Sequence, residues 1–251
     1  MKKVKHNSLL FLLAGSVLFF SSCNKDGTGD QEFETISFDK QEILDNIPAG
    51  LKNSTDTYAQ QCYSDIESAL DMSNFMDDMT PPEDAVRSSK KAAGDTWQWT
   101  VSDGTNSLTF YWSYEEDSQT KYWTMEIQID EGEVFPYITA KESKDGKQGE
   151  VLYNFNWVVA YEGYGPEAAD LYWKYHWNVD NTGNYTFNWD YDSNDPSYDF
   201  FLNYEVVVNA DGSGTIDYYS MDAKYYHMEW DSQGNGSWTY YIINMSGTWS
   251  V

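Results

Sequence analysis

Hydrophobic and polar residues alternate with a period of two along most of the chain from Trp97 onward. Side chains alternate across a β-strand, so each alternating run predicts a strand with one apolar and one polar face. Such strands belong to antiparallel sheets that water reaches on one side. The clearest runs cover residues 108–114, 123–129, 151–159, 185–190 and 198–208.

Turn signals separate these runs, and no long helical pattern lies between them. Asp-Gly pairs and neighbouring glycines supply the positive φ that tight hairpins require. The order therefore predicts an antiparallel up-and-down meander of about 11–12 strands, which should be curved because strand twist accumulates. A weak repeat, 212–219 echoed by 234–241, indicates one hairpin per period. The turn signals lie at 103–104, 131–132, 145–146, 163–166, 181–183, 195–196, 211–212 and 233–234.

Before the strands the apolar spacing changes to three and four, which predicts an amphipathic helix over about 54–75. An earlier short helix is expected around Ile43, Leu44 and Ile47, ended by Pro48. Pro81 and Pro82 stop helical structure, and 83–93 is expected to be a connector with one or two turns. The apolar stripe of the main helix consists of Tyr58, Ala59, Cys62, Ile66, Ala69 and Leu70.

These patterns predict a mainly β protein of the α+β class, in which the N-terminal amphipathic helix packs on the curved meander. The helical segment and connector cover 37–93 and the meander covers 94–251, and the two form one globular domain. Residues 23–36 are rich in Gly and Asp without periodicity, which is typical of a flexible tether.

The N-terminus has the features of a secretory signal over 1–22. Three lysines precede an apolar run at 9–20 that is too short to span a bilayer, and Ser21 and Ser22 precede Cys23. This end resembles the lipobox of bacterial lipoproteins, in which the cysteine becomes the acylated first residue. Residues 24–26, with Asp30 and Glu32, resemble the export tag of Bacteroides-like surface lipoproteins. The resemblance implies lipidation of Cys23 and a membrane contact through that anchor. It implies attachment to the outer membrane, at the cell surface or its periplasmic face.

The strongly negative charge of the chain disfavours anionic partners such as nucleic acids. The formal net charge is −26, and loss of Lys2, Lys3 and Lys5 with the signal leaves 12 basic against 41 acidic residues, or −29. Such a chain repels nucleic-acid phosphates and anionic lipid surfaces, and Arg87 is its only arginine. We therefore expect no nucleic-acid partner.

Aromatic residues are unusually abundant, with 11 Trp, 21 Tyr and 12 Phe spread over the alternating runs. This distribution favours a folded sheet over disorder. Six of these residues are candidates either for the core or for a ligand-facing surface, and the sequence leaves both interpretations open. They are Trp112, Trp123, Trp157, Phe187, Trp189 and Trp238.

The sequence offers little catalytic chemistry. It contains no G-x-S-x-G, H-E-x-x-H or P-loop motif, so we predict a protein that is not an enzyme and that needs no cofactor or metal. His176 and His227 are interpreted as residues of a sheet face, and Cys62 as a small buried residue. Segment 190–196 has oxygen ligands at alternate positions but departs from the EF-hand pattern, and it is interpreted as an acidic turn.

We therefore expect a non-catalytic envelope lipoprotein with a ligand-binding or accessory role. The element order is similar to that of the periplasmic lipoprotein-carrier and half-barrel lipid-binding families, which would imply an apolar ligand. Alternatives are a carbohydrate-binding surface lipoprotein, or a structural subunit of an envelope protein complex. A deep apolar cavity would favour a lipid, a flat exposed surface a glycan, and a broad apolar patch a protein partner.

Overall fold

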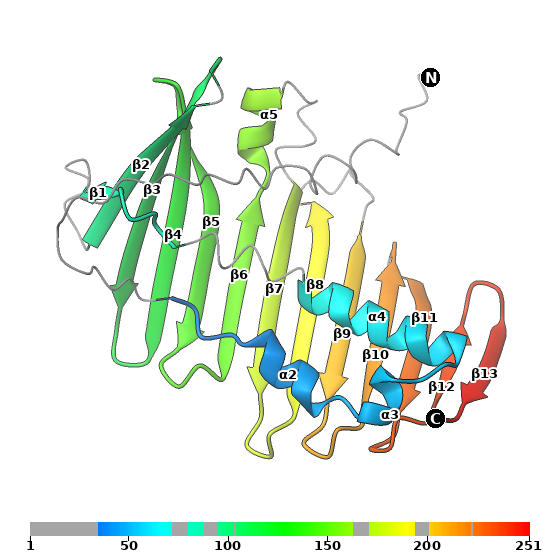
Figure 1. Ribbon diagram of the computed structural model, residues 1–251. Coiled ribbons are helices and arrows are strands. Elements are labelled where there is room, and N and C mark those ends of the chain that lie inside the picture. Colours follow the sequence, from blue (N-terminus) through cyan, green and yellow to red (C-terminus); the bar gives the residue numbers. More distant parts are fainter. Residues whose placement is uncertain are drawn as a thin grey trace, which may run out of the picture. The chain divides into compact units, whose positions relative to one another are not determined.

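The computed structural model of the protein describes residues 35–71, 80–87, 95–102, 104–162, 171–193, 201–221 and 223–251. All of them belong to one compact unit, Phe33–Val251. The unit is mainly β, as predicted, and its strands and helices are shown in Figure 1.

Within the described ranges, thirteen strands form a single antiparallel sheet in which each strand pairs with its neighbours in chain order. This confirms the up-and-down meander. The strands are β1 (Val86–Arg87), β2 (Asp95–Ser102), β3 (Ser107–Glu116), β4 (Thr120–Ile129), β5 (Val134–Ser143), β6 (Gln148–Asn154), β7 (Leu171–Val179), β8 (Tyr185–Ser193), β9 (Leu202–Val208), β10 (Gly214–Ser220), β11 (Ala223–Trp230), β12 (Gly236–Tyr240) and β13 (Met245–Trp249).

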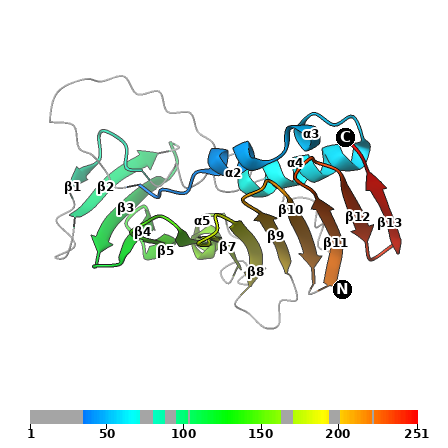
Figure 2. The same cartoon turned by 90° about the horizontal axis from the view of Figure 1, so that it is seen from below.

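The sheet differs from the expectation in strand number and in curvature. It has thirteen strands rather than 11–12, and it stays open and uncurled, with β1 and β13 as its edges. Figure 2 shows the sheet from below, with helices along one face. Because helices and large aromatic rings cover the apolar face, the sheet does not have to curl upon itself to bury it.

Four helices complete the described chain: α2 (Lys40–Asn46), α3 (Ala49–Lys52), α4 (Thr57–Asp71) and α5 (Asn156–Glu162). The predicted main helix is confirmed as α4, although residues 72–75 of the prediction lie outside the described ranges. The short helix expected around Ile43 is confirmed as α2, which ends just before Pro48 as predicted. Pro48 is also the N-cap of α3, because proline is tolerated where a helix begins. No helix in the described ranges is long and apolar enough to cross a bilayer.

Helix α4 lays its apolar stripe on the sheet, as the sequence predicts. Ala59, Cys62 and Ile66 are each fully buried. The ring of Tyr58 stacks on that of Trp238 in β12 with centroids 4.0 Å apart. Farther along the helix, the hydroxyl of Tyr226 in β11 donates to the Asp65 carboxylate at 2.8 Å. One part of the core therefore lies between α4 and the strands that it crosses in Figure 1, and the same buried cluster continues across the apolar face to β2.

The segment that leads into α2 is also fixed to the sheet. The ring of Phe38 lies 5.1 Å from Trp177 and 5.6 Å from Phe187, measured between centroids. The backbone N–H and the hydroxyl of Ser37 both donate to Glu142 in β5, at 2.9 and 2.7 Å. The globular fold thus includes Ser37 and Phe38, which are only one and two positions after the predicted tether.

At three places a tryptophan ring lies over a glycine of the neighbouring strand and its indole also bonds to a turn. A Cβ added to any of these glycines would come within 2.4 Å of the ring, so only glycine fits beneath it. Each indole N–H donates to a backbone carbonyl in the turn that precedes the glycine's strand, at 2.7–3.2 Å. Two of the three glycines belong to the sequence repeat, which is therefore a hairpin unit as expected. The pairs are Trp177 with Gly149, Trp230 with Gly214, and Trp249 with Gly236.

Two predicted segments have a different structure. The alternating run 151–159 is a strand only as far as Asn154, after which α5 begins. Contacts at helical spacing replace strand pairing there. The ring of Trp157 contacts that of Tyr161 one helical turn later, with centroids 6.1 Å apart. In the predicted connector, Val86 and Arg87 form the short strand β1 on the edge of β2. Residues 88–94 lie outside the described ranges.

The loop between α2 and α4 approaches the hairpin turns so closely that two glycines are required. Gly212 and Gly234 both have positive φ, at 85° and 99°, as the turn signals predict. A Cβ would lie 2.7 Å from the Asn46 carbonyl oxygen at Gly212, and 2.4 Å from the Leu51 nitrogen at Gly234. These turns therefore have two roles: they reverse the chain direction, and they make close contact with α2 and α3.

Comparing the stability of Gly234→Ala with that of Gly104→Ala should separate the cost of the turn conformation from the cost of the contact with α3. Gly104 also has positive φ, at 88°, but a Cβ there would meet nothing within 4 Å. We expect Gly104→Ala to cost about 1–2 kcal/mol of unfolding free energy for the left-handed backbone alone. Gly234→Ala should cost a further 1–3 kcal/mol or so for the clash with α3. Equal losses in urea melts would show that α3 does not rest on this turn.

Candidate functional site: the polar face of the sheet

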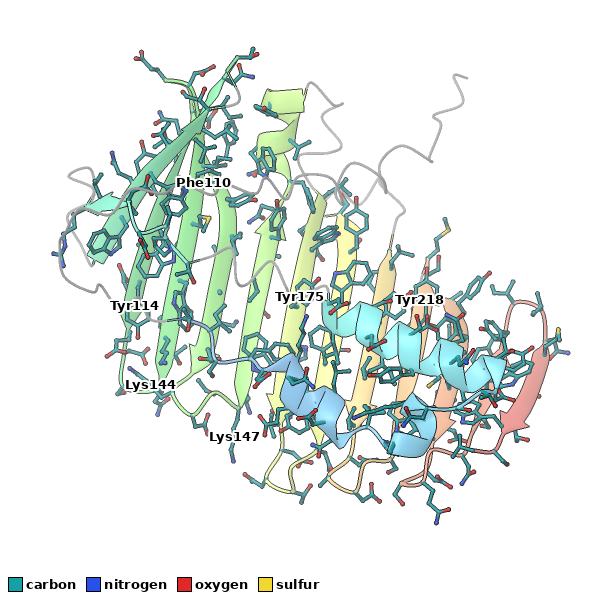
Figure 3. All side chains as sticks on the ribbon, viewed as in Figure 1. Phe110, Tyr114, Lys144, Lys147, Tyr175 and Tyr218 are labelled. Atoms are coloured by element: carbon teal, nitrogen blue, oxygen red, sulfur yellow. The ribbon has the colours of Figure 1, made fainter. Side chains whose placement is uncertain are left out.

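The aromatic residues singled out in the sequence lie mostly in the core. Five of the six are at most 6% exposed, namely Trp112, Trp123, Phe187, Trp189 and Trp238. The sixth, Trp157, lies in α5 and is half-buried. Figure 3 shows further aromatic side chains, including Phe110, Tyr175 and Tyr218, on the sheet face that α4 crosses.

Tyrosines continue this aromatic face across β9 to β12. Tyr204, Tyr218, Tyr226 and Tyr240 stand directly opposite one another on successive strands, with ring centroids 4.6–5.5 Å apart. Burial raises the pKa of each hydroxyl, to about 12 for Tyr204. These rings pack against one another and against α4, so we treat this face as structural.

The opposite face of the sheet is polar and open to water. On β7 to β11, residues that face away from α4 are half-buried or exposed, and they alternate with buried ones. The register brings one polar residue from each of these strands into a line, which we call the central row. With neighbours about 4.8 Å apart, the line is roughly 19 Å long. The central row consists of His176, Asn188, Glu205, Asp217 and His227.

An ordered group of charges stands at the β10–β11 end of the central row. Nδ1 of His227 and Nζ of Lys224 lie 2.7 and 2.8 Å from the same oxygen of Asp217. Nε2 of His227 lies 3.9 Å from Glu229. Burial lowers the pKa of Lys224, but the contacts with Asp217 and Tyr219 together outweigh burial and raise the pKa overall. The imidazole is thus held in one orientation, with side chains 15% exposed for Asp217 and 25% for His227.

At the other end of the central row, Glu150 of β6 stands opposite His176 and binds two lysines. Its carboxylate oxygens lie 3.3 Å from Lys141 and 2.9 Å from Lys174. Burial by itself would raise the pKa of Glu150, but the two lysines, Lys174 foremost, lower it. His176 also faces Asn188, with Nδ1 and Nδ2 3.4 Å apart.

A second row of polar groups runs beside the central row. Asp190 stands between Lys174 and Asn203, whose side-chain amide donates to the carboxylate. Burial raises the pKa of Asp190, and the hydrogen bond from Asn203 offsets part of that rise. Next to it, the Tyr172 hydroxyl donates to Asp192 at 3.4 Å. The polar face thus presents carboxylates, amides, imidazoles and phenols side by side.

A shallow depression of about 390 Å³ adjoins the central row at the turn end of β10–β12. Its walls include Thr215, Glu229 and Ser237, which stand opposite one another on the polar face. The Ser237 hydroxyl donates to Glu229 at 2.8 Å. The walls combine hydroxyl, amide and carboxylate groups with the Trp230 ring, so the depression offers both hydrogen-bonding and apolar surface.

The side chains of this face are hydrogen-bond donors and acceptors. No group of three or more His, Cys, Asp or Glu side chains in the described part of the chain is arranged to hold a metal ion. Asp190 and Asp192, interpreted from sequence as the start of an acidic turn, lie in β8, because their strand pairing continues to Ser193. Residues 194–196 lie outside the described ranges. Cys62 is fully buried, and burial raises the pKa of its thiol, which disfavours the reactive thiolate.

Sequence reasoning found part of the polar face. It interpreted His176 and His227 as residues of a sheet face, and the structure confirms this. It did not single out Asn188, Glu205 or Asp217. Their alternation with apolar residues places them on the polar face, but only the strand register shows that they stand in line.

Asp190→Asn should change the pH dependence of stability. Because burial raises the folded-state pKa of Asp190 above its ordinary value of 3.8, ionisation is penalised in the folded state. The stability that this residue contributes is therefore lost as pH rises from about 4 through the raised pKa. The unfolding free energy of the variant minus that of the wild type should grow from pH 3 to pH 7 or so. Urea melts across this range that give a constant difference would contradict the raised pKa.

A comparison of the chain with protein-family models, curated proteins and solved structures finds no match. The function is therefore inferred from the side chains themselves. The polar face is the place where accessible and pre-oriented groups of several chemical kinds come together.

Proposed function

We propose that this protein is a non-catalytic envelope lipoprotein, anchored through Cys23, that binds a glycan on the polar face of its sheet. The observation that supports this most is the central row. Its side chains offer both donors and acceptors, as the hydroxyls of a sugar do. Two of them, Asp217 and His227, are already held in place by their contacts with each other and with Lys224, which reduces the entropy lost on binding.

The charge of the protein favours an uncharged ligand. With a formal net charge of −29 once residues 1–22 are lost (12 basic against 41 acidic residues), the protein repels anionic polymers, whereas a neutral glycan meets no such barrier. The lysines of the face are paired with Glu150 and Asp217, so they do not form a free cationic patch. An open row of roughly 19 Å suits an extended chain of several sugars better than a single compact ligand.

The face also carries tyrosines on which sugar rings could stack. Tyr172 and Tyr219 both point to the polar side, as their register partners Asp192 and Asn203 do. Nζ of Lys224 lies 5.2 Å from the centre of the Tyr219 ring and helps to orient it. Tyrosine combines a flat apolar surface with a hydroxyl, which is what a sugar face with its polar edge requires.

The lipid-carrier alternative has less support. In the described part of the chain, the aromatic side chains that would line an apolar pocket pack against one another and against α4. A surface glycan-binding role agrees with the resemblance of residues 24–26 to the export tag of surface lipoproteins.

Glycan binding can be tested with the unit 33–251 on an array of neutral oligosaccharides, with hits measured by titration calorimetry. We expect Asn188→Ala and Asp217→Asn each to weaken binding about tenfold or more, which corresponds to about 1.4 kcal/mol per lost interaction. Ser113→Ala, on the polar face of distant β3, is the matched control and should bind as the wild type does. If no glycan binds, or the control loses as much affinity, this face is not a glycan site.

The anchor is tested separately with Cys23→Ala in the native host, followed by membrane fractionation and labelling with a palmitate analogue. The variant should lose the acyl label and leave the membrane fraction. It should keep its fold, because the fully buried core residues begin at Ile43 and the residues packed against them begin at Ile36, well after Cys23. Retention of the variant in the membrane fraction would remove lipidation from the proposal.

A further inference from the structure

The edge strand β13 lies in a stretch of the chain that has no charge. Residues 232–251 contain no Asp, Glu, Lys, Arg or His, although the chain has 41 acidic and 15 basic residues. In the described part of the chain, β13 pairs only with β12. One side of its backbone is therefore left without a strand partner.

Exposed apolar side chains surround this edge. Ile242, Ile243 and Met245, in and just after the β12–β13 turn, are 60%, 61% and 50% exposed. Natural sheet edges are commonly protected by charges, prolines, bulges or short strands. The edge at β13 has neither charge nor proline, and its register with β12 is regular over five pairs. The opposite edge ends in the two-residue strand β1, which carries Arg87.

The charge distribution points to a second copy of this chain as the occupant. Two copies that each carry a charge of −26 repel each other across most of their surfaces. The uncharged edge is where they can approach without this penalty. A two-fold axis requires a surface that is complementary to itself, and an uncharged strand meets this requirement.

The pattern of β13 is also symmetric about its central glycine. Antiparallel pairing about Gly247 places Met245 of one copy opposite Trp249 of the other, and Ser246 opposite Thr248. In β13, Met245, Gly247 and Trp249 belong to the apolar face, as their partners Tyr240, Trp238 and Gly236 show. The pairing therefore joins apolar face to apolar face and polar face to polar face.

We propose that two copies of the protein join edge to edge through β13, in an antiparallel pair about a two-fold axis at Gly247. The two sheets then become one continuous sheet. Their polar faces lie on the same side, so a ligand polymer could engage both copies and bind with higher avidity. Self-association itself does not depend on the glycan proposal.

Sedimentation equilibrium of the unit 33–251 over a wide concentration range tests the proposal. The wild type should show a reversible dimer, tighter at high salt because the net repulsion is screened. The double variant Ser246→Lys/Thr248→Lys places like charges directly opposite each other across the axis, and should weaken the dimer at least tenfold. Thr100→Lys on β2, near the other edge, adds the same kind of charge and should leave the dimer unchanged.

Three results would overturn the proposal: a wild type that stays monomeric, a dimer that the double variant leaves intact, or a dimer that Thr100→Lys disrupts. Near-ultraviolet circular dichroism of the tryptophans checks that each variant is folded. If the double variant does not fold, hydrogen exchange of the wild type decides instead. Amides of β13 should become more protected as concentration rises, and protection that is independent of concentration would contradict pairing through this edge.

Discussion

A single-layer sheet has an apolar face that must be shielded from water, and this constraint governs the arrangement of the described chain. Helix α4 covers part of that face, with Tyr58 stacked on Trp238 and Asp65 bonded to Tyr226. The sheet also shields its own backbone from water. Indole rings such as that of Trp230 lie over glycines of the neighbouring strand. Since burying apolar surface is the main favourable term in folding, both devices are needed to keep an open meander stable.

The same division of faces leaves the polar side free for function. Because the described helices lie on the other face, the strands can carry His176, Asn188 and Asp217 in line. Fixed strand spacing then sets the distances between these groups, which a loop would do less precisely. Stability and binding are thus assigned to opposite faces of one layer, and each strand contributes to both through alternate residues.

The sequence predicts the strand order, the turns and the α4 stripe well, since each depends on local periodicity. It fails where two periodicities overlap, as at Trp157, where helical spacing follows directly after a strand. It also misjudges the curvature, because nothing local indicates that helices and Trp–Gly contacts would cover the apolar face of an open sheet. The central row requires the register of five strands, and that is a property of long-range pairing which a single sequence does not reveal.

The division of faces is tested most directly at two adjacent residues of β8. Phe187 is 1% exposed beside Phe38, whereas Asn188 belongs to the central row. In urea melts, Phe187→Ala should lose about 3–5 kcal/mol of unfolding free energy, as a buried aromatic does. Asn188→Ala should lose less than about 0.5 kcal/mol, as an ordinary surface change does. Equal losses, or a larger loss at Asn188, would contradict the assignment of one face to the core and the other to binding.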